Sequence, residues 1–363
     1  MHFGSFMEFG TRSGVSHADV FREGFEHARL CEDTGLDSVW LSEFHFMPDR
    51  SVLSSPIVVA GALAQCTKRV RIGMAVYVLP LTNPLRVAEE SASVDQISGG
   101  RLDFGIGRSG FARQYKIYNI DYGESQERFE ESLTVLRKAW TGEKFCYDGK
   151  YYQVVDAQLI PVPMQKPHPP MRMAASSPGT FKTVAEEGLP LFVGLRGDGL
   201  ESLKINIAIY REIWKKAGHE GNGSVFLRVP VYAADTEQAA YDEPRDCIIH
   251  YFERQAKMIA SAGAQGASAE AMRAKISKSL SALSYDDILA SRAAIGTPAM
   301  LMDRLTEWQE VLGIDGVVME LNAGNLLTEA QISSSTRLIA EQVMPTFKSV
   351  SYTHLTLPTI YSV

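Results

Sequence analysis

The sequence predicts an α/β fold, a (β/α)8 TIM barrel with an insertion before its last strand. Short apolar runs alternate with longer amphipathic stretches along the 363 residues. Eight of these runs are apolar at nearly every position, as expected of parallel strands that are buried on both faces. Eight is the strand number of the barrel, although a doubly wound open sheet is the alternative that the same alternation allows.

The first half of the chain begins with a strand at residues 3–9. In the helix that follows, Ser16 and Asp19 have the spacing of a capping box, and Gly35 marks the end. The next elements alternate in the same way, and they are strand 36–44, helix 54–68, strand 70–79, helix 83–100 and strand 101–107.

The second half contains two departures from this alternation. Residues 144–156 predict a hairpin around Asp148-Gly149. Residues 235–295 are polar and rich in alanine, which indicates an insertion that could act as a mobile lid. The regular elements around them are helix 124–140, strand 171–176, helix 180–188, strand 189–195, helix 200–218, strand 226–234, helix 296–313, strand 315–321 and helix 329–344.

The predicted organisation is one barrel domain over residues 1–348. Residues 349–363 contain no Asp, Glu, Lys or Arg and show no helical period. They resemble the translation of an adaptor used in DNA sequencing libraries. We therefore expect a non-native tail that takes no part in function.

Composition limits the class of protein. Because nucleic-acid binding needs a concentrated basic surface, a net charge of −7 argues against it. The longest apolar run, residues 74–81, is too short to span a bilayer, and the first residues predict a strand rather than a signal peptide. Cys31, Cys66, Cys146 and Cys247 are far apart and predict neither a disulfide framework nor a metal site. We expect a cytoplasmic protein that binds no nucleic acid, membrane or metal.

Residues 105–110, Gly-Ile-Gly-Arg-Ser-Gly, match the G-x-G-x-x-G fingerprint of dinucleotide-binding folds. That fingerprint requires a helix that opens at its last glycine and an acidic residue at the end of a following strand. The residues after Gly110 carry no consistent apolar face, and we expect the next helix only near Glu124. The pattern therefore does not predict an NAD site.

In a barrel the carboxyl ends of the strands carry the functional residues. Arg108 follows the fourth predicted strand and is suited to bidentate phosphate binding, and Gly107 lets a ligand approach the backbone. On the next barrel strand, Ser176, Ser177 and Thr180 stand where a helix begins, with free amides behind them. A structural ion pair for the arginine and ordinary N-capping for the hydroxyls are the alternatives.

A second polar group, Glu43 and His45, follows the second strand. A carboxylate and an imidazole at this place could carry out acid–base chemistry. A purely structural Glu–His pair is the alternative.

Five segments, taken in order, resemble the bacterial luciferase-like family of flavin-dependent monooxygenases, and the resemblance extends over essentially all of residues 1–348. The segments are VWLSEFHF, RIGMAVYVLPLTNPLRVAEE, DQISGGRLDFGIGR, SSPGT followed by AEEGLP, and IGTPAMLMDRL. The family has a TIM-barrel fold, in agreement with the pattern of strands and helices.

The resemblance implies a binding site for FMN. Arg108, Ser177 and Thr180 would hold the phosphate, and Ala75-Val76 would form a bulge beneath the isoalloxazine ring through a non-proline cis peptide. The complete set of cofactor-binding residues would be Glu43, Ala75, Val76, Gly107, Arg108, Ser176, Ser177 and Thr180.

The chain departs from luciferase itself at three positions. Luciferase has two histidines after the glutamate, whereas this chain has Phe44 and His45. We therefore expect no light emission from a long-chain aldehyde, and His45 is the candidate catalytic residue, for proton management. Gly107 replaces a reactive cysteine, and Asn322 replaces an acidic residue. Phe44 and Phe111 would line the substrate pocket together with Asn322.

The function implied by the resemblance is that of a two-component monooxygenase. Reduced FMN from a separate flavin reductase would react with O2 to give a flavin C4a-hydroperoxide, which oxidises a small or medium organic substrate. The alternatives are a deazaflavin-dependent dehydrogenase on the same barrel and a non-catalytic flavin-binding member. The resemblance also implies a homodimer through helices 54–67 and 84–99.

Overall fold

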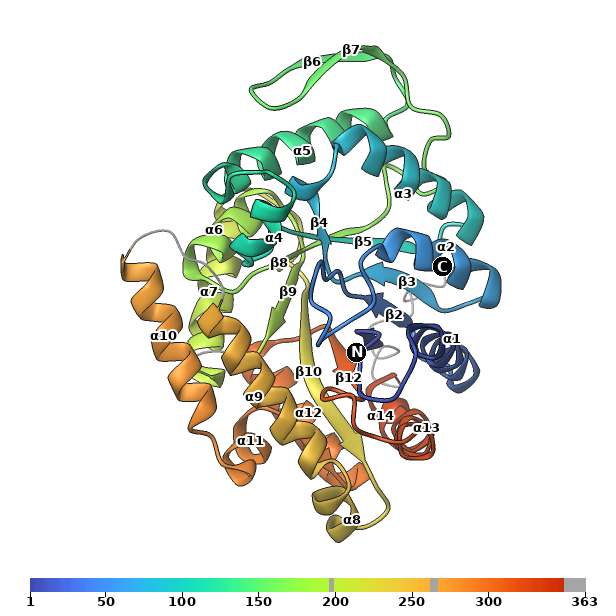
Figure 1. The fold of residues 1–363 in the computed structure, drawn as a ribbon, viewed down its shortest axis with the longest axis vertical. Helices are drawn as coiled ribbons and strands as arrows, with labels where there is room; N and C mark the ends of the chain where they lie inside the picture. The colour runs from blue at the N-terminus through green and yellow to red at the C-terminus, as the bar shows by residue number, and fades with distance from the viewer. Residues whose placement is uncertain (196–198, 262–266, 349–363) are drawn as a thin grey trace, which may run out of the picture.

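In the computed structural model, eight parallel strands close into a barrel that helices surround (Figure 1). The structure describes residues 1–195, 199–261 and 267–348, so the tail expected to be non-native, 349–363, lies outside the described residues. The predicted TIM barrel is confirmed, and the open-sheet alternative is wrong. Around the barrel the strands are β1 (His2–Met7), β2 (Ser38–Leu41), β3 (Arg71–Met74), β5 (Leu102–Gly107), β8 (Met171–Ala174), β9 (Leu191–Gly194), β10 (Val225–Ala233) and β12 (Gly316–Glu320).

Helices cover the outside of the barrel (Figure 1). The first of them begins as the sequence predicts, since the Ser16 hydroxyl accepts from the amide of Asp19 and Gly35 ends the helix with a φ of 78°. The outer helices are α1 (His17–Thr34), α2 (Pro56–Cys66), α3 (Pro84–Ser98), α5 (Ser125–Trp140), α6 (Pro178–Glu186), α7 (Leu200–Lys216), α12 (Pro298–Leu312) and α13 (Glu329–Leu338), which continues through a π-helical turn (Ile339–Val343) into α14 (Met344–Lys348).

Aromatic side chains fill the middle of the barrel. Trp40 is completely buried, and its ring lies 5.1 Å from the ring of Phe192 and 6.0 Å from that of Phe226. A Cβ atom at Gly73 would lie 2.2 Å from the Trp40 ring, so only glycine leaves room for the tryptophan. The barrel is therefore a packed core, and a ligand can reach it only at an end.

The strand predicted over residues 70–79 is wrong in one respect. β3 ends at Met74, and the chain resumes as β4 (Tyr77–Val78), which pairs with β5 at Ile106 and Gly107. The apolar run continues across this interruption, so the sequence pattern could not locate it.

The prediction that no helix forms before Glu124 is also wrong, because α4 spans Ala112–Ile117. The short helix is held by tertiary contacts rather than by an apolar face. The side-chain amide of Gln114 donates from Nε2 to the carbonyl of His45 at 3.2 Å, and the Tyr115 hydroxyl donates to the carbonyl of Arg108. A short 3-10 turn (Tyr122–Glu124) then leads into α5.

The two irregular segments lie outside the regular alternation. Residues 144–156 form the hairpin of β6 (Phe145–Asp148) and β7 (Gln153–Ala157), which projects beyond α5 (Figure 1). The described part of the segment 235–295, which omits 262–266, contains four helices, and its role as a lid stays a prediction. These elements are α8 (Glu237–Asp242), α9 (Arg245–Ser261), α10 (Ala267–Ser281) and α11 (Tyr285–Ser291), followed by β11 (Ala294–Gly296) on β10.

Two further properties concern membranes and metals. Of the helices that the structure describes, none combines the length and apolar character needed to cross a bilayer. Within the same described ranges, no three His, Cys, Asp or Glu side chains form a group that could hold a metal ion.

We predict an acid-dependent loss of stability that originates at His27. Its Nε2 lies 2.8 Å from the Ser5 hydroxyl, and burial lowers the pKa of His27 from 6.5 to about 4. Between these values the unfolded chain binds a proton that the folded protein does not, so stability falls as the pH falls through that range. The wild type should lose about 2 kcal/mol of its free energy of unfolding between pH 7 and pH 5 because of His27, and His27→Gln should remove this part of the loss, measured by urea unfolding.

The matched control is His17→Gln, at an exposed histidine on the same helix. This variant should retain the wild-type difference in the free energy of unfolding between pH 7 and pH 5. Equal pH dependence in the His27→Gln variant and the wild type would contradict the prediction.

Candidate active site

The residues predicted from the sequence lie at the mouth of the barrel, where the strands have their carboxyl ends. Glu43 lies two residues after β2, Ala75 directly after β3 and Arg108 directly after β5. Ser176 lies two residues after β8 and Asn322 two residues after β12. Because parallel strands of one barrel end at the same rim, these positions share one face of the molecule.

Glu43, His45 and Tyr118 form a hydrogen-bonded chain at this rim. Glu43 Oε1 lies 2.6 Å from His45 Nε2, and the two side chains are only 4% and 9% exposed. His45 Nδ1 lies 3.1 Å from the Tyr118 hydroxyl. Burial and the charge of Glu43 raise the pKa of Tyr118, so the phenol is protonated and donates to Nδ1. His45 then carries its proton on Nε2 and donates to Glu43.

The other oxygen of Glu43 stabilises the interruption between β3 and β4. Glu43 Oε2 accepts the amide of Val78 at 3.0 Å. The peptide between Ala75 and Val76 is cis, which is the conformation that the family resemblance implies. The buried carboxylate therefore joins the acid–base pair to the bulge on which a flavin ring was predicted to lie.

Two glycines allow β5 to approach this bulge closely. A Cβ atom at Gly105 would lie 1.9 Å from the carbonyl oxygen of Met74, and one at Gly107 would lie 2.5 Å from Cγ2 of Val76. Close packing of neighbouring strands explains both glycines without a pyrophosphate. The structure thus agrees with the rejection of the NAD interpretation, although a short helix does follow.

The predicted phosphate-binding elements lie at the ends of two strands that pair directly, β5 and β8. Arg108 is half-buried and donates from Nη1 to the hydroxyl of Ser125 at 3.0 Å. At the start of α6, the hydroxyls of Ser177 and Thr180 lie 2.9 Å apart, and Ser177 does not cap the helix with its side chain. Two hydroxyls and the first amides of a nine-residue helix therefore stand beside the strand that carries Arg108.

The residues predicted for a substrate pocket have different surroundings. Phe44 is buried, and the guanidinium of Arg50 lies 3.9 Å from the centre of its ring. Phe111 is half-buried directly before α4. The side-chain oxygen of Asn322 accepts the amide of Leu327 at 3.1 Å, so this residue orders the loop after β12. Their roles in substrate binding stay predictions.

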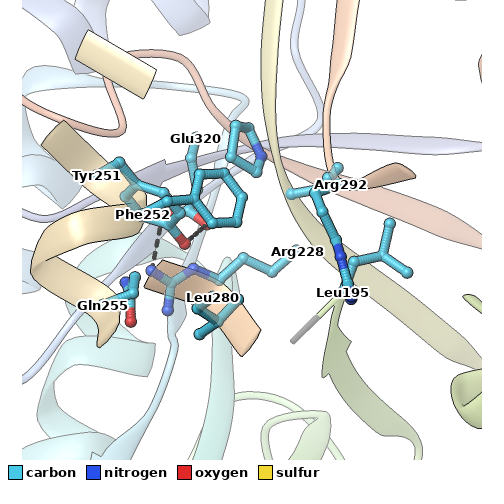
Figure 2. Close-up of a pocket in the computed structure, with 10 residues that line it drawn as sticks. Leu195, Arg228, Tyr251, Phe252, Gln255, Leu280, Arg292 and Glu320 are labelled. Atoms are coloured by element: carbon cyan, nitrogen blue, oxygen red, sulfur yellow. Dashed lines mark hydrogen bonds and ion pairs between the residues drawn. The ribbon is translucent and has the colours of Figure 1, made fainter. Parts of the chain in front are cut away.

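The sequence interpretation missed a network of buried charges at the floor of the mouth. Glu8 accepts from Arg50 through one oxygen and from Arg254, at 2.9 Å, through the other. Arg228 donates to Glu320 at 2.7 Å (Figure 2). Arg228 also lies 3.6 Å from Glu8. Burial alone would raise the pKa of Glu8, but the three guanidinium groups outweigh it and hold that pKa below its ordinary value. A charged residue that stands alone in an otherwise apolar predicted strand is the sequence feature from which this network could have been predicted.

Residues 1–315 match the luciferase-like monooxygenase family. The chain belongs to this family. It is similar to the oxygenase component of the flavin-dependent trigonelline monooxygenase of Acinetobacter baylyi, with 25% identity over 352 residues that cover 94% of each chain. Family membership and this relative make the luciferase-like protein a flavin-dependent oxidoreductase.

Solved structures share the fold of this luciferase-like chain. The oxygenating constituent of 3,6-diketocamphane monooxygenase from Pseudomonas putida, solved in complex with FMN, superposes with a TM-score of 0.82 at 21% identity, over 95% of this chain and 98% of the other. An F420-dependent secondary alcohol dehydrogenase superposes with a TM-score of 0.73 at 18% identity, over 94% and 98%. The same barrel therefore occurs with both kinds of cofactor.

Proposed function

We propose that this protein is the oxygenase component of a two-component monooxygenase. It would take reduced FMN from a separate flavin reductase and use O2 to oxidise a small or medium organic substrate. The observation that carries the proposal is that Arg108 and the hydroxyl pair of Ser177 and Thr180 follow two strands, β5 and β8, that pair directly. The relatives support it, since one is named as an oxygenase component and another was solved with FMN.

These residues fit the phosphate of FMN. A guanidinium pairs with two phosphate oxygens, and the start of α6 offers amides and the positive end of the helix dipole, with Ser176 at its approach. The ring would lie against Gly107 and the Ala75-Val76 peptide, where the glycine adds no side chain. When bound, reduced FMN supplies the electrons that activate O2.

The protein's own contribution to the chemistry would come from Glu43 and His45. The buried carboxylate accepts the proton that His45 carries on Nε2, and Tyr118, which is 40% exposed, donates to the opposite nitrogen. The three groups can therefore move a proton between the exposed edge of the site and its buried floor. Phe44 and Phe111 would exclude water from the same region.

The direct test mixes the purified protein with photoreduced FMN and then with air-saturated buffer in a stopped-flow spectrometer. We expect bound flavin to reoxidise more slowly than free reduced FMN, with a transient absorbance that free flavin lacks, because the site excludes water. Arg108→Ala should weaken binding of reduced FMN roughly 10- to 100-fold, since it removes a charged phosphate partner.

Riboflavin, which has no phosphate, is the matched ligand, and its affinity should not change in Arg108→Ala. Arg113→Ala, at an exposed arginine on α4, is the matched variant and should bind FMN like the wild type. Reoxidation of protein-bound flavin at the free-flavin rate would contradict the monooxygenase. Equal losses of FMN and riboflavin affinity would show that Arg108 does not hold the phosphate.

A deazaflavin-dependent dehydrogenase is the second candidate, because an F420-dependent dehydrogenase shares the fold. The absorbance of the cofactor that the purified protein retains, together with titrations of FMN and F420, separates the two. Tighter binding of F420 than of FMN, combined with hydride transfer in the absence of O2, would favour the dehydrogenase.

We predict that His45→Gln leaves the affinity for reduced FMN unchanged and removes the pH dependence of flavin reoxidation. The substitution removes a titratable imidazole but none of the proposed phosphate partners. The measurement is the stopped-flow reoxidation rate across a series of pH values. Tyr118→Phe keeps the imidazole and should retain a pH dependence, whereas an unchanged profile in His45→Gln would assign His45 a structural role.

We also propose a homodimer through α2 and α3. The whole of α2 lacks a charged residue, and Val58 on it is 68% exposed. On the adjacent α3, Ile97 is 51% exposed. A helix that is apolar on all sides is normally buried, so a second copy of the chain is the expected cover.

Val58→Lys should weaken association of the dimer more than about 100-fold, because it would bury an unpaired ammonium group in the interface. Sedimentation velocity over a range of concentrations measures the effect. The control is Val155→Lys on the projecting β7, where the valine is 85% exposed. A wild type that sediments as a monomer, or a Val58→Lys variant that associates as tightly, would contradict the interface.

A further inference from the structure

A small cavity with a mainly apolar wall and a few polar groups lies beside the mouth, between the barrel and the helices of the 235–295 segment (Figure 2). Arg228 of β10 and Gln255 of α9 contribute polar groups to its wall, and Leu195, Phe252 and Leu280 contribute apolar ones. Its volume of about 10 Å³ is close to the space that one water molecule needs.

Gln255 is the unusual group in this wall. It is only 2% exposed, and neither its amide nitrogen nor its amide oxygen has a hydrogen-bond partner within the part of the chain that the structure describes. Nε of Arg228 also has no hydrogen-bond partner there, whereas Nη2 of the same guanidinium donates to Glu320. Buried polar groups without partners are costly, so a pair of them at one cavity indicates a ligand.

The charges around the cavity indicate the kind of ligand. Both oxygens of Glu8 are already engaged by Arg50 and Arg254, and both oxygens of Glu320 by Arg228 and Tyr251. Three guanidinium groups face two carboxylates, so the network keeps one positive charge in excess. The unused groups on the cavity wall are mainly donors, which an anionic acceptor would satisfy.

We propose that this cavity binds a carboxylate of the enzyme's substrate, held between Nε2 of Gln255 and the guanidinium of Arg228. The proposal rests on the proposed function, because the bound acid is taken to be the molecule that the enzyme oxidises. Leu195, Phe252 and Leu280 would face an apolar body, so the substrate class is that of small organic acids with an apolar part. A carboxylate is larger than the cavity, so Leu280 or Phe252 must move on binding.

The network also relates the cavity to the acid–base pair. Arg50, which bonds to Glu8, stacks over the ring of Phe44, and Phe44 lies between Glu43 and His45 in sequence. The ion pairs therefore connect Arg228 on the cavity wall with the segment that carries the acid–base pair.

The test uses three probes of similar shape, benzoate, benzamide and benzyl alcohol, with the full-length protein and without flavin. Isothermal titration calorimetry should detect benzoate binding at concentrations up to roughly 10 mM, with benzamide and benzyl alcohol at least about ten-fold weaker. Gln255→Met, which keeps the shape of the side chain and removes its donor, should weaken benzoate binding roughly ten-fold or more.

A second variant tests the charge argument. Gln255→Glu would place a carboxylate of the protein itself beside Arg228, so we expect it to abolish benzoate binding and to raise the melting temperature of the unliganded protein. Gln153→Met, at an exposed glutamine on β7, is the matched control and should bind benzoate like the wild type.

Three results would overturn the carboxylate site. They are the absence of benzoate binding, equal binding of benzamide and benzoate, and unchanged benzoate affinity in Gln255→Met. The affinity of each variant for reduced FMN is measured in parallel. If the protein binds FMN and slows flavin reoxidation but does not bind benzoate, the carboxylate site alone is rejected. If the protein binds benzoate but neither binds reduced FMN nor slows its reoxidation, the proposed monooxygenase alone is rejected.

Discussion

Closure of the barrel is the constraint on which the site depends. β1 pairs with β12 on one side, where Phe3 aligns with Val317, and with β2 on the other, where Gly4 aligns with Ser38. Because every strand runs in the same direction, all carboxyl ends meet at one mouth. Side chains separated by most of the chain, such as Glu8 and Glu320, thereby contact the same arginine.

The charge network depends in turn on the aromatic layer beneath it. The guanidinium of Arg228 lies 3.4 Å from the centre of the Phe6 ring, so the ion pairs rest on the packed middle of the barrel. Removing one member of such a buried network typically costs about 3–5 kcal/mol, because its partner is left charged and unpaired. The network joins β10, β12, α9 and the residue directly after β1, and the floor of the mouth is consequently held by strands and helix together.

The sequence predicted the barrel because strands buried on both faces leave continuous apolar runs, and this signal is local. It did not predict α4, since this helix is held by contacts outside itself, from Gln114 to the distant carbonyl of His45 and from Tyr115 to the carbonyl of Arg108. The charge network was missed for the same reason. Arg254 and Glu8 are 246 positions apart, and neither residue shows any periodicity that marks a partner. The bulge at residues 75–76 was expected only through the family resemblance, because its apolar run gives no local sign of a break.

The glycines of residues 105–110 show how a motif can be correct as a pattern and misleading as a function. Gly105 is required by the carbonyl of Met74, and Gly107 by the side chain of Val76. Both requirements come from the neighbouring strand, whose interruption brings its backbone against β5. Arg108 directly follows Gly107, the last residue of β5, and so stands at the rim. The spacing of a dinucleotide fingerprint therefore arises here from strand packing, and the phosphate contact that we propose for this segment comes from the arginine between the glycines rather than from a helix that follows them.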